Sequence, residues 1–518
     1  MRIYRSAAAD IAIPDVTITE LVLAGLEGRE DAPALIDGPS GRVMTGAEFR
    51  DRVERLAGGL AARGIGPGHV VAIHAPNQPD WCVVFHAVAW AGGTATTLNP
   101  SSTAEEVGHQ LRDAGAELLV TAPALLPAAL AGAAGTGVRE IAVIGAAEGA
   151  LALEAMLGER MTAQVPVDPA RSVVVMPYSS GTTGLPKGVL LTHRNLVANV
   201  LQTAAVVGIR PGDVTLAFLP YFHIYGMTVL MNLYLTAGGV QVTLPRFELE
   251  AALRLIAAHR MRQLFVAPPV VLALARHPLV GQFDLSSLEY LLSGAAPLGP
   301  ELAADCAARI GCETVQGYGM TEMSPVSHFT PPGKNRPGAS GPQVAMTECR
   351  LVDPESGEDC APEEPGELWV RGPQVMLGYH GNPAATAATL TADGWLRTGD
   401  LALIDADGYM TIVDRVKELI KVSGFQVAPA EIEAVLLAHP EVADVAVVGV
   451  PDEKCGEVPK AFVVPAAGAR PELGELQRHL AAHVATYKQV QALELVEAIP
   501  KSPSGKILRR LLRGQPAG

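Results

Sequence analysis

Residues 172–189, which read SVVVMPYSSGTTGLPKGV, combine an apolar run with a loop of small and hydroxylated residues. The run 172–176 is typical of a buried β-strand, and residues 178–189 are typical of a loop that leaves the strand. Five hydroxyl side chains, Gly181, Gly184 and Lys187 lie within this loop. Glycines let backbone N–H groups converge, and hydroxyls and ammonium groups bind anions, so the stretch indicates an anion-binding cradle.

An ordinary glycine-rich turn is the alternative interpretation of this loop. A Walker A phosphate loop is excluded, because Gly188 follows Lys187 where that motif has a serine or threonine. The number of hydroxyl groups beside the lysine favours the anion site over the ordinary turn.

Helical and strand patterns alternate on both sides of this stretch. Thr45 and Glu48 stand at capping-box spacing before a run of apolar residues at helical intervals, which predicts a helix over 45–63. The alternation predicts an α/β fold with largely parallel sheets. The next expected elements are a strand at 70–74, a helix at 80–91, a strand at 94–97, a helix from Ser102 with Glu105 in its first turn, and a strand at 117–121.

The pattern changes in the second half of the chain. After about residue 340, short strand patterns separated by turn signals predict an antiparallel or mixed section. The last hundred or so residues predict a compact α+β unit that begins with a helix after Pro429.

Composition narrows the classes of partner. The 518 residues carry 39 Lys and Arg against 54 Asp and Glu, a net charge of −15 without a long basic run, which argues against a nucleic-acid-binding surface. This balance alone favours neutral or cationic ligands. The six cysteines show no metal-binding spacing, and no apolar stretch is long enough to span a membrane, so we expect a cytoplasmic protein.

Three further clusters carry groups that suit a nucleotide. Residues 316–322, QGYGMTE, place an aromatic ring, a hydroxyl and a carboxylate in a glycine-loosened turn. Thr398-Gly-Asp400 ends a strand-like segment with a carboxylate that can accept both hydroxyls of a ribose. Residues 414–426, DRVKELIKVSGFQ, supply three cations and then a glycine turn.

These clusters together resemble those of the adenylate-forming enzymes, which include acyl-CoA synthetases, peptide-synthetase adenylation domains and beetle luciferases. Within that group the sequence is most similar to the 4-coumarate:CoA ligases, over essentially the whole chain. The resemblance rests on eight motifs in one order: YSSGTTGLPKGV (178–189), PYFHIYG (220–226), SGAAPLG (293–299), QGYGMTE (316–322), PGELWVRG (365–372), TGD (398–400), DRVKELIKVSGFQVAPAEIE (414–433) and SPSGKILRR (502–510).

The resemblance implies two domains and two half-reactions. A large N-terminal domain, residues 1–413, has mixed and parallel sheets, flanking helices and a barrel-like β section. A small, mobile α+β C-terminal domain, residues 414–518, rotates about a hinge near Lys417. A carboxylate first attacks the α-phosphorus of MgATP to give an acyl-adenylate and pyrophosphate, and the thiol of CoA then displaces AMP.

The resemblance also implies roles for particular residues. Lys506 reaches the α-phosphate during adenylation, and His223 orients the carboxylate or opens a path for the thiol. Glu322 holds Mg²⁺, a cation that prefers oxygen ligands. Thr321 and Lys421 complete the implied catalytic set. The implied ATP- and AMP-binding residues are Ser179, Ser180, Gly181, Thr182, Thr183, Lys187, Gln316, Gly317, Tyr318, Thr321, Asp400, Arg415, Gln426 and Lys506.

The resemblance assigns the acid and CoA sites in the same way. One phenol and several small side chains admit a flat ring, which favours hydroxycinnamates and leaves benzoate-type and medium-chain fatty acids open. The implied acyl-binding residues are Tyr225, Ala295, Gly317, Pro325, Val326, Phe329, Lys417 and Lys421, and the implied CoA-binding residues are Arg246, Ser423 and Gly424. Phe329 and Trp369 depart from the residues common in plant members.

The expected partners are therefore a small carboxylic acid, ATP and CoA, with no nucleic acid and no membrane, and the oligomeric state stays open. Three other functions remain possible alternatives: a luciferase-like oxygenase, a stand-alone adenylation module that loads a carrier protein, and a noncatalytic binding protein. The last is the weakest of these, because Lys187, Glu322 and Lys506 are all present.

Overall fold

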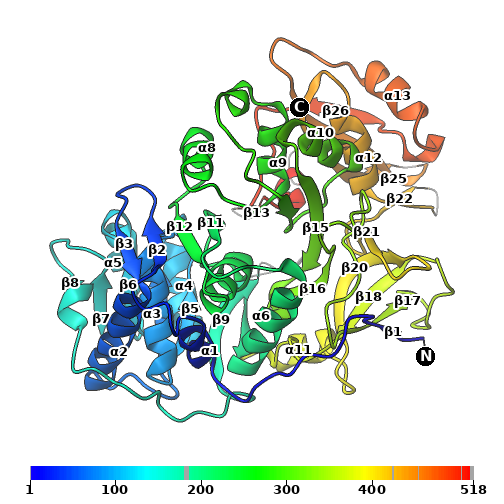
Figure 1. Cartoon of the computed structure of the whole chain (residues 1–518). Coiled ribbons are helices and arrows are strands. Elements are labelled where there is room, and N and C mark those ends of the chain that lie inside the picture. The colour runs from blue at the N-terminus through cyan, green and yellow to red at the C-terminus, as the bar shows by residue number, and fades with distance from the viewer. Residues whose placement is uncertain (1, 180–185, 423–424, 453, 503–504, 514–518) are drawn as a thin grey trace.

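The structure, a computed structural model, describes residues 2–179, 186–422, 425–452, 454–502 and 505–513. These residues form five β-sheets with helices packed around them (Figure 1). Within the described ranges, no helix combines the length and the apolar composition needed to cross a membrane.

The largest sheet has eight strands in the order β19-β10-β9-β5-β4-β6-β7-β8. The strands from β9 to β8 run parallel, as the sequence predicts, whereas β10 and β19 are antiparallel. Their bounds are β4 (Val70–His74), β5 (Thr94–Thr97), β6 (Ala116–Thr121), β7 (Glu140–Val143), β8 (Leu151–Ala152), β9 (Val173–Ser179), β10 (Lys187–Thr192) and β19 (Gly378–Tyr379).

Helices cover both faces of this sheet. Val71 and Ile73 face a core shared with α2 (Gly46–Ala62) and α3 (Pro79–Trp90), while Ala72 faces a second core shared with α4 (Ala104–Ala114) and α5 (Leu126–Ala133). Alternate residues of a strand point to opposite faces, so a strand covered on both sides is apolar throughout. This explains the uninterrupted apolar run at 70–74.

The helix α2 starts at the cap that the sequence predicts, whereas α4 starts one residue later than predicted. Thr45 caps α2, and its hydroxyl accepts a hydrogen bond from the backbone of Glu48. The helix expected from Ser102 begins later, because Thr103 and Glu106 form the reciprocal capping box in place of Ser102 and Glu105.

Two four-stranded sheets stand beside the first, in the orders β11-β12-β2-β3 and β13-β14-β15-β16. Each has three parallel strands and one antiparallel edge strand. The bounds are β2 (Pro33–Asp37), β3 (Val43–Thr45), β11 (Val214–Ala217), β12 (Val240–Thr243), β13 (Gln263–Val266), β14 (Tyr290–Ser293), β15 (Glu313–Gly319) and β16 (Val326–Phe329). The neighbouring helices are α1 (Ile18–Gly25), α6 (His193–Val207), the π-helix η3 (Tyr225–Asn232), α7 (Leu233–Thr236), α8 (Leu249–Ala258), α9 (Pro268–Arg276) and α10 (Pro300–Ile310).

The antiparallel or mixed section expected after residue 340 belongs to a five-stranded antiparallel sheet in the order β1-β17-β18-β20-β21. Strands β1 and β21 form its two edges, so the sheet is a half-barrel rather than a closed one. The bounds are β1 (Tyr4–Arg5), β17 (Glu348–Val352), β18 (Gly366–Arg371), β20 (Leu396–Ile404) and β21 (Met410–Arg415), with α11 (Pro383–Thr389) nearby.

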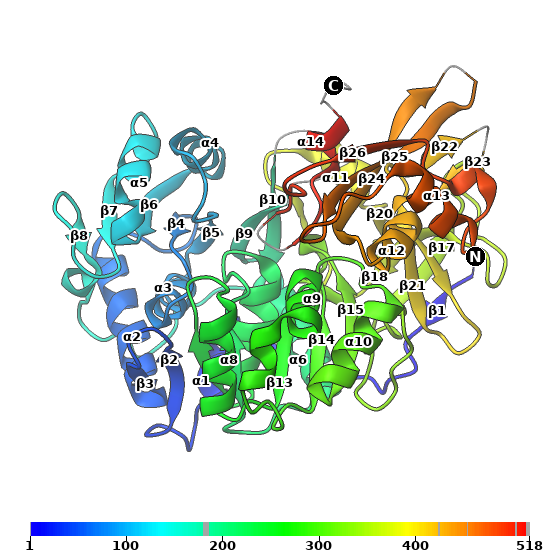
Figure 2. The same ribbon diagram turned by 90° about the horizontal axis from the view of Figure 1, so that it is seen from above.

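The remaining residues form a separate sheet with its own apolar core, which begins at Ile420. Figure 2 shows this C-terminal segment, orange to red, lying over the parts that carry β15 and β20. The bounds are β22 (Ile420–Val422), β23 (Phe425–Val427), β24 (Val442–Asp452), β25 (Gly456–Pro465), β26 (Ala492–Leu495), α12 (Pro429–Leu437), α13 (Leu473–Ala481) and α14 (Arg509–Arg513).

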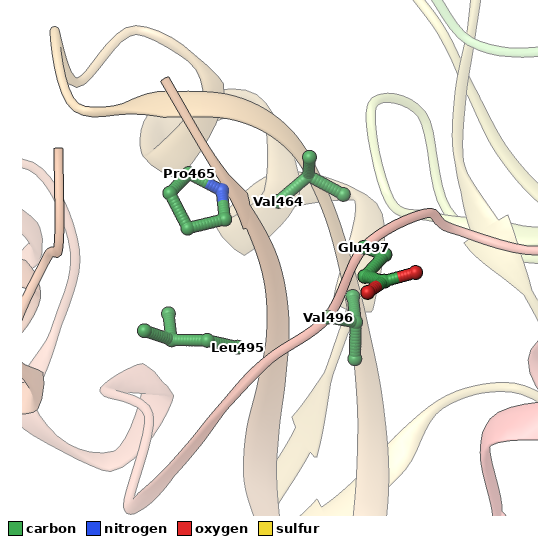
Figure 3. A pocket seen from close by; sticks show the side chains of 5 residues that line it. All are labelled: Val464, Pro465, Leu495, Val496 and Glu497. Atoms are coloured by element: carbon green, nitrogen blue, oxygen red, sulfur yellow. The ribbon is translucent and has the colours of Figure 1, made fainter. Parts of the chain in front are cut away.

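A shallow hollow of about 530 Å³ lies on the surface of this segment (Figure 3). Residues at the ends of β25 and β26 line it: Val464, Pro465, Leu495, Val496 and Glu497. The hollow contains none of the residues that the sequence motifs single out, so it is not a candidate for the active site.

Two adjacent glycines inside α2 allow a close backbone contact. A Cβ atom at Gly59 would overlap the carbonyl oxygen of Met156, and one at Gly58 would overlap that of Glu159. Glycine in a helix interior costs about 1 kcal/mol relative to alanine. The contact between α2 and residues 156–159 explains why this cost is retained.

We expect Gly59→Ala to lower the free energy of unfolding by about 1–3 kcal/mol, because the backbone of 156–159 must move away from the new methyl group. Gly474 is the matched control, because it is a helical glycine in α13 with no atom within 4 Å of its Cβ position. Gly474→Ala should leave stability unchanged or raise it by about 0.5 kcal/mol. Denaturant titrations followed by circular dichroism measure both changes, and a shift of the same sign in the two variants would contradict the packing argument.

Candidate active site

A buried carboxylate joins two of the sequence motifs. Glu322 lies in the short 3-10 turn Thr321–Met323 after β15, and its Oε1 atom accepts hydrogen bonds from the hydroxyls of Ser179 and Tyr379, each at 2.9 Å. Ser179 is the last residue of β9, and Tyr379 lies on β19. The fold therefore places the implied cation ligand beside the start of the anion-binding loop.

The two ends of that loop face each other. Ser179 on β9 is paired with Lys187 on β10, and the Nζ atom of Lys187 lies 5.0 Å from the centre of the Tyr379 ring. The stacked ring holds the ammonium near the loop. Ser180, Gly181, Thr182 and Thr183 lie outside the described residues.

A second buried carboxylate sits between two strands of the half-barrel. Asp400 on β20 is paired in register with Arg415 on β21, and the Arg415 Nε atom lies 3.2 Å from Asp400 Oδ1. The hydroxyl of Tyr318, on β15, donates a hydrogen bond to Asp400 Oδ2. Burial and the neighbouring Asp400 raise the pKa of Tyr318 well above its usual value, so this hydroxyl stays protonated.

Gln316, which is implied to contact the nucleotide, also holds a nearby loop through its side chain. Its side-chain amide donates to the carbonyl of Leu298 and accepts from the Leu298 N–H, both at 3.2 Å. The side chain thus fastens the loop 293–299 to β15. The neighbouring Gly317 packs closely against β16, because a Cβ atom at this position would lie only 3.3 Å from the carbonyl oxygen of His328.

Lys506 lies on a hairpin that contacts the larger part of the molecule. The Ser502 N–H donates to the Lys506 carbonyl at 2.8 Å, and the Lys506 N–H donates to the Ser502 hydroxyl at 3.1 Å. Gly505 has a φ of +84°, and a Cβ there would lie 3.2 Å from Pro269 and 3.4 Å from Ala267. A glycine therefore suits both the turn and the close approach.

The charge of Lys506 depends on residues from both parts of the chain. Burial and the nearby cation of Arg415 lower its pKa from 10.5 to about 8, while Asp400, Glu418 and Glu322 act in the opposite direction. The ammonium group thus lies in the field of both buried carboxylates. Three implied functional groups that are far apart in the sequence are therefore coupled electrostatically.

His223 lies in the segment between β11 and η3. Its Nδ1 atom accepts a hydrogen bond from the Tyr225 N–H at 3.3 Å, which leaves the proton of the neutral ring on Nε2. Burial, with a smaller effect from Lys506, lowers the pKa of His223 to about 4. At neutral pH this side chain is therefore an uncharged N–H donor.

Six of the residues implied for the acyl site lie on or beside η3, β14, β15 and β16: Tyr225, Ala295, Gly317, Pro325, Val326 and Phe329. The Tyr225 ring lies against Gly294, where a Cβ would be 3.2 Å from the ring, and its hydroxyl donates to the Leu292 carbonyl at 3.3 Å. Gly317 is paired with buried Phe329 across β15 and β16. Ala295 is exposed with a φ of +71°, and buried Val326 follows Pro325 at the start of β16.

Several implied residues lie apart from this group in the structure. Lys421 and Gln426 are exposed and paired with each other across β22 and β23, and Lys417 is exposed in the turn before them. Arg246 is exposed and forms a salt bridge with Glu248. Ser423 and Gly424 lie outside the described residues.

Two residues at the site were not singled out from the sequence. Tyr379 binds Glu322, but it reaches β10 from a distant part of the chain, and no local pattern announces that pairing. Buried Asn77 holds the segment before His223 by donating to the carbonyls of Ala217 (3.0 Å) and Leu219 (2.8 Å) and accepting from the Tyr221 N–H. A Pro-Asn pair after a strand reads as an ordinary turn in the sequence.

One carboxylate is available for a magnesium ion. The described residues contain no group of three or more His, Cys, Asp or Glu side chains that could hold a metal alone. Mg²⁺ usually binds one or two carboxylates together with substrate phosphates and water. Glu322, beside the anion-binding loop, fits that donor set.

Comparison with known sequences identifies two families. The profile described as AMP-binding enzyme matches residues 24–380, and that described as AMP-binding enzyme C-terminal domain matches residues 431–506. Curated relatives include 4-coumarate--CoA ligase 5 of Oryza sativa subsp. japonica, 40% identical over 99% of this chain and 97% of the relative. The 4-coumarate--CoA ligase 1 of Arabidopsis thaliana is 38% identical over 99% of this chain and 95% of the relative.

Solved structures with the same fold include ligand complexes. ATP-bound MatB from Rhodopseudomonas palustris has a TM-score of 0.87 at 31% identity, covering 96% of this chain and 98% of its own. The anthranilate CoA ligase AuaEII with anthranoyl-AMP has a TM-score of 0.90 at 27% identity, covering 97% of each chain. Apo MatB has a TM-score of 0.79, with the same coverage as the ATP-bound form.

The shared electrostatic site predicts how Lys506 titrates. Amine labelling followed by peptide mass spectrometry should give half-maximal reactivity at Lys506 near pH 8. Arg415→Gln should raise that midpoint because it removes a neighbouring cation, and Asp400→Asn should lower it because it removes an anion that favours the ammonium. A midpoint unmoved by either substitution would show that Lys506 does not share the site with this ion pair.

Proposed function

The chain belongs to the AMP-binding enzymes, and on that basis we propose that it is an ATP-dependent carboxylate:CoA ligase that works through an acyl-adenylate. The observation that carries the proposal is the pair of buried carboxylates, Glu322 bonded to Ser179 at the anion-binding loop and Asp400 paired with Arg415, which both favour the charged form of Lys506. Relatives named 4-coumarate--CoA ligase and a structural neighbour solved with anthranoyl-AMP support it.

In the first half-reaction a carboxylate oxygen of the acid attacks the α-phosphorus of ATP. A bond forms between these atoms as the bond to the bridging oxygen breaks, and pyrophosphate leaves. Two anions must approach, so cations at contact distance lower the barrier. Lys506, protonated below about pH 8, supplies such a charge. Thr321 would bind the α-phosphate.

The nucleotide would be held from both sides of the site. Asp400 would accept the ribose hydroxyls, since carboxylate oxygens accept more than one hydrogen bond and Arg415 and Tyr318 fix its orientation. Ser179, Lys187 and the loop between them would hold the β- and γ-phosphates. When bound, Mg²⁺ supplies compensating charge on the phosphates, and Glu322 would hold it.

His223 would bind the acid before the attack. Its neutral ring with Nε2–H can donate a hydrogen bond to a carboxylate without adding a charge that would hold the nucleophile back. Asn77 keeps this segment in place from the end of β4. The same histidine would lie near the carbonyl carbon of the adenylate.

In the second half-reaction the CoA sulfur attacks that carbonyl carbon, and AMP leaves. We propose that residues 414–518 rotate about Lys417 relative to residues 1–413, so that the β22–β23 hairpin replaces Lys506 at the site. That rotation accounts for the exposed positions of Lys421 and Gln426 in the present arrangement. Ser423, Gly424 and Arg246 would then bind CoA.

The present arrangement corresponds to the adenylation step. Lys506 already shares the site with Asp400 and Glu322, and the hairpin that carries it packs on Pro269. The higher TM-score to ATP-bound MatB than to the apo form points the same way.

The acid is most consistent with an aromatic carboxylate of the hydroxycinnamate type. Tyr225 is one of the residues implied to bind the acid. Its phenol hydroxyl donates a hydrogen bond to the Leu292 carbonyl and can still accept one from a substrate hydroxyl. Gly294 leaves no side chain against the Tyr225 ring, and Gly317 leaves none beside Phe329. A benzoate-type acid is the second candidate, because the chain also resembles the anthranilate CoA ligase.

We place the reaction in the cytoplasm. All six cysteines are free, and four are buried. Unpaired thiols suit a reducing compartment.

Lys506→Ala tests the assignment of the two half-reactions. The variant should lose adenylate formation by about 100-fold or more, because the charge at the α-phosphate is gone. It should keep thioester formation from supplied acyl-adenylate and CoA, because in that half-reaction the β22–β23 hairpin takes the place of Lys506 at the site. Equal loss in both half-reactions would contradict the role given to Lys506.

The acid preference is testable by pyrophosphate release with 4-coumarate, cinnamate, benzoate, anthranilate and octanoate, each with and without CoA. We expect 4-coumarate to give the highest kcat/KM, with a CoA thioester formed without any carrier protein. Tyr225→Phe should lower kcat/KM for 4-coumarate about tenfold and leave cinnamate unchanged, because only the former loses a hydrogen bond. Faster turnover of octanoate than of any aromatic acid would overturn this preference.

A further inference from the structure

Arg509 follows Lys506 closely in the sequence and is held by three acceptors. It is the first residue of α14, and its side chain is 11% exposed. Its guanidinium donates to Glu418, to Glu433 Oε2 at 2.6 Å and to the Val447 carbonyl at 3.2 Å. Each partner belongs to a different element of the C-terminal segment.

One of these partners joins the two parts of the chain. Glu418 lies in the turn 416–418, which leads from β21, the edge strand of the half-barrel, to β22, an inner strand of the C-terminal sheet. The same turn follows Arg415, which pairs with Asp400. Arg509 therefore links the segment that carries Lys506 to the point where the chain crosses between the sheets.

The other partners fix Arg509 against the C-terminal core. Glu433, on α12, also accepts a hydrogen bond from the Val447 N–H on β24 at 2.7 Å. Burial raises the pKa of Glu433, and the Arg509 cation opposes that rise. The guanidinium thus neutralises carboxylates that have little access to water.

Asp414 adds a third carboxylate near this cation. It is 4% exposed and accepts hydrogen bonds from the backbone of Ala430 and Arg415. Burial raises its pKa to about 6, and Arg509 is the largest influence in the opposite direction. Loss of the cation would leave three buried acids together, and a lysine cannot reproduce the planar fork that reaches several acceptors.

The hairpin has a weaker attachment on its other side. The backbone of Lys501 forms a β-bridge with Ile507, and its Nζ atom donates a hydrogen bond to Asp444 at 2.6 Å. The side chains of Lys501 and Asp444 are each about a quarter exposed. Partly exposed ion pairs contribute little. Of these two side chains, Arg509 is more deeply buried than Lys501.

We propose that Arg509 is a positioning residue for the adenylation half-reaction, which fixes the Lys506 hairpin to the turn 416–418 so that the ammonium group reaches the α-phosphate. This inference rests on the proposed function. Arg509 acts through Lys506 and does not touch the nucleotide. Its loss therefore affects the half-reaction that uses Lys506 and spares the one that uses the β22–β23 hairpin.

The test compares Arg509→Lys with Arg510→Lys, a matched control at the exposed neighbouring arginine. The full-length chain is assayed for pyrophosphate release with ATP and 4-coumarate, and for thioester formation from supplied 4-coumaroyl-adenylate and CoA. Arg509→Lys should lower kcat of adenylation by about 10- to 100-fold, since small misplacements of a catalytic group have effects of this size. The KM for ATP and the thioester step should stay within about two-fold of wild type, as should both reactions of Arg510→Lys.

A second variant guards against simple unfolding of the first. Glu418→Gln keeps the shape of the side chain and removes the ion pair, so it should lower adenylation in the same selective way, by a smaller factor. Thermal melts accompany each assay. Wild-type rates for Arg509→Lys, or equal losses in both half-reactions for the two variants, would overturn the positioning role. Absence of pyrophosphate release in the wild type with every acid would instead count against the proposed function.

Discussion

The carboxylate of Asp400 is the interaction on which the rest of the site depends. It accepts the Tyr318 hydroxyl from β15, pairs with Arg415 on β21 and favours the charged form of Lys506. Without this anion, the mutual repulsion of Lys506 and Arg415, two cations from different segments, would be less well compensated. Opposite charges in such a place interact more strongly than on an open surface, so one buried acid can organise three elements.

The ends of strands supply most of the other groups. Ser179 ends β9, Lys187 begins β10, and Glu322 follows β15. Residues at these positions have one flank fixed by strand pairing and the other in a loop, so their side chains are held in place and still reach a ligand. The glycines of the motifs serve the same purpose, since Gly317 and Gly505 allow neighbouring atoms to approach.

The net charge of −15 shows how little a global balance says about a local site. It makes a nucleic-acid surface a poor first hypothesis, yet it also favours neutral or cationic ligands, which is wrong for a family that binds AMP. Charges beyond about 8–10 Å are screened by salt, whereas Lys506 and Lys187 act at contact distance. The C-terminal segment uses its cations in pairs with buried acids, as Arg509 does with Glu433.

The sequence by itself determined the parallel sheet and most helix starts, because periodicity and capping act over short distances. Its motifs, which resemble those of the adenylate-forming enzymes, predict Ser179, Asp400 and Lys506 as site residues. It placed the start of α4 at Ser102, whereas Thr103 caps the helix, because two adjacent hydroxyl residues can both act as caps.

Only the tertiary structure decided that Gln316 fastens Leu298, that Tyr379 binds Glu322, and that Arg509 joins the Lys506 hairpin to Glu418. Each of these contacts joins segments that are distant in the chain or that meet only after separate sheets have formed. No local pattern encodes such a meeting, because it is the packing of whole sheets that brings the partners within hydrogen-bonding distance.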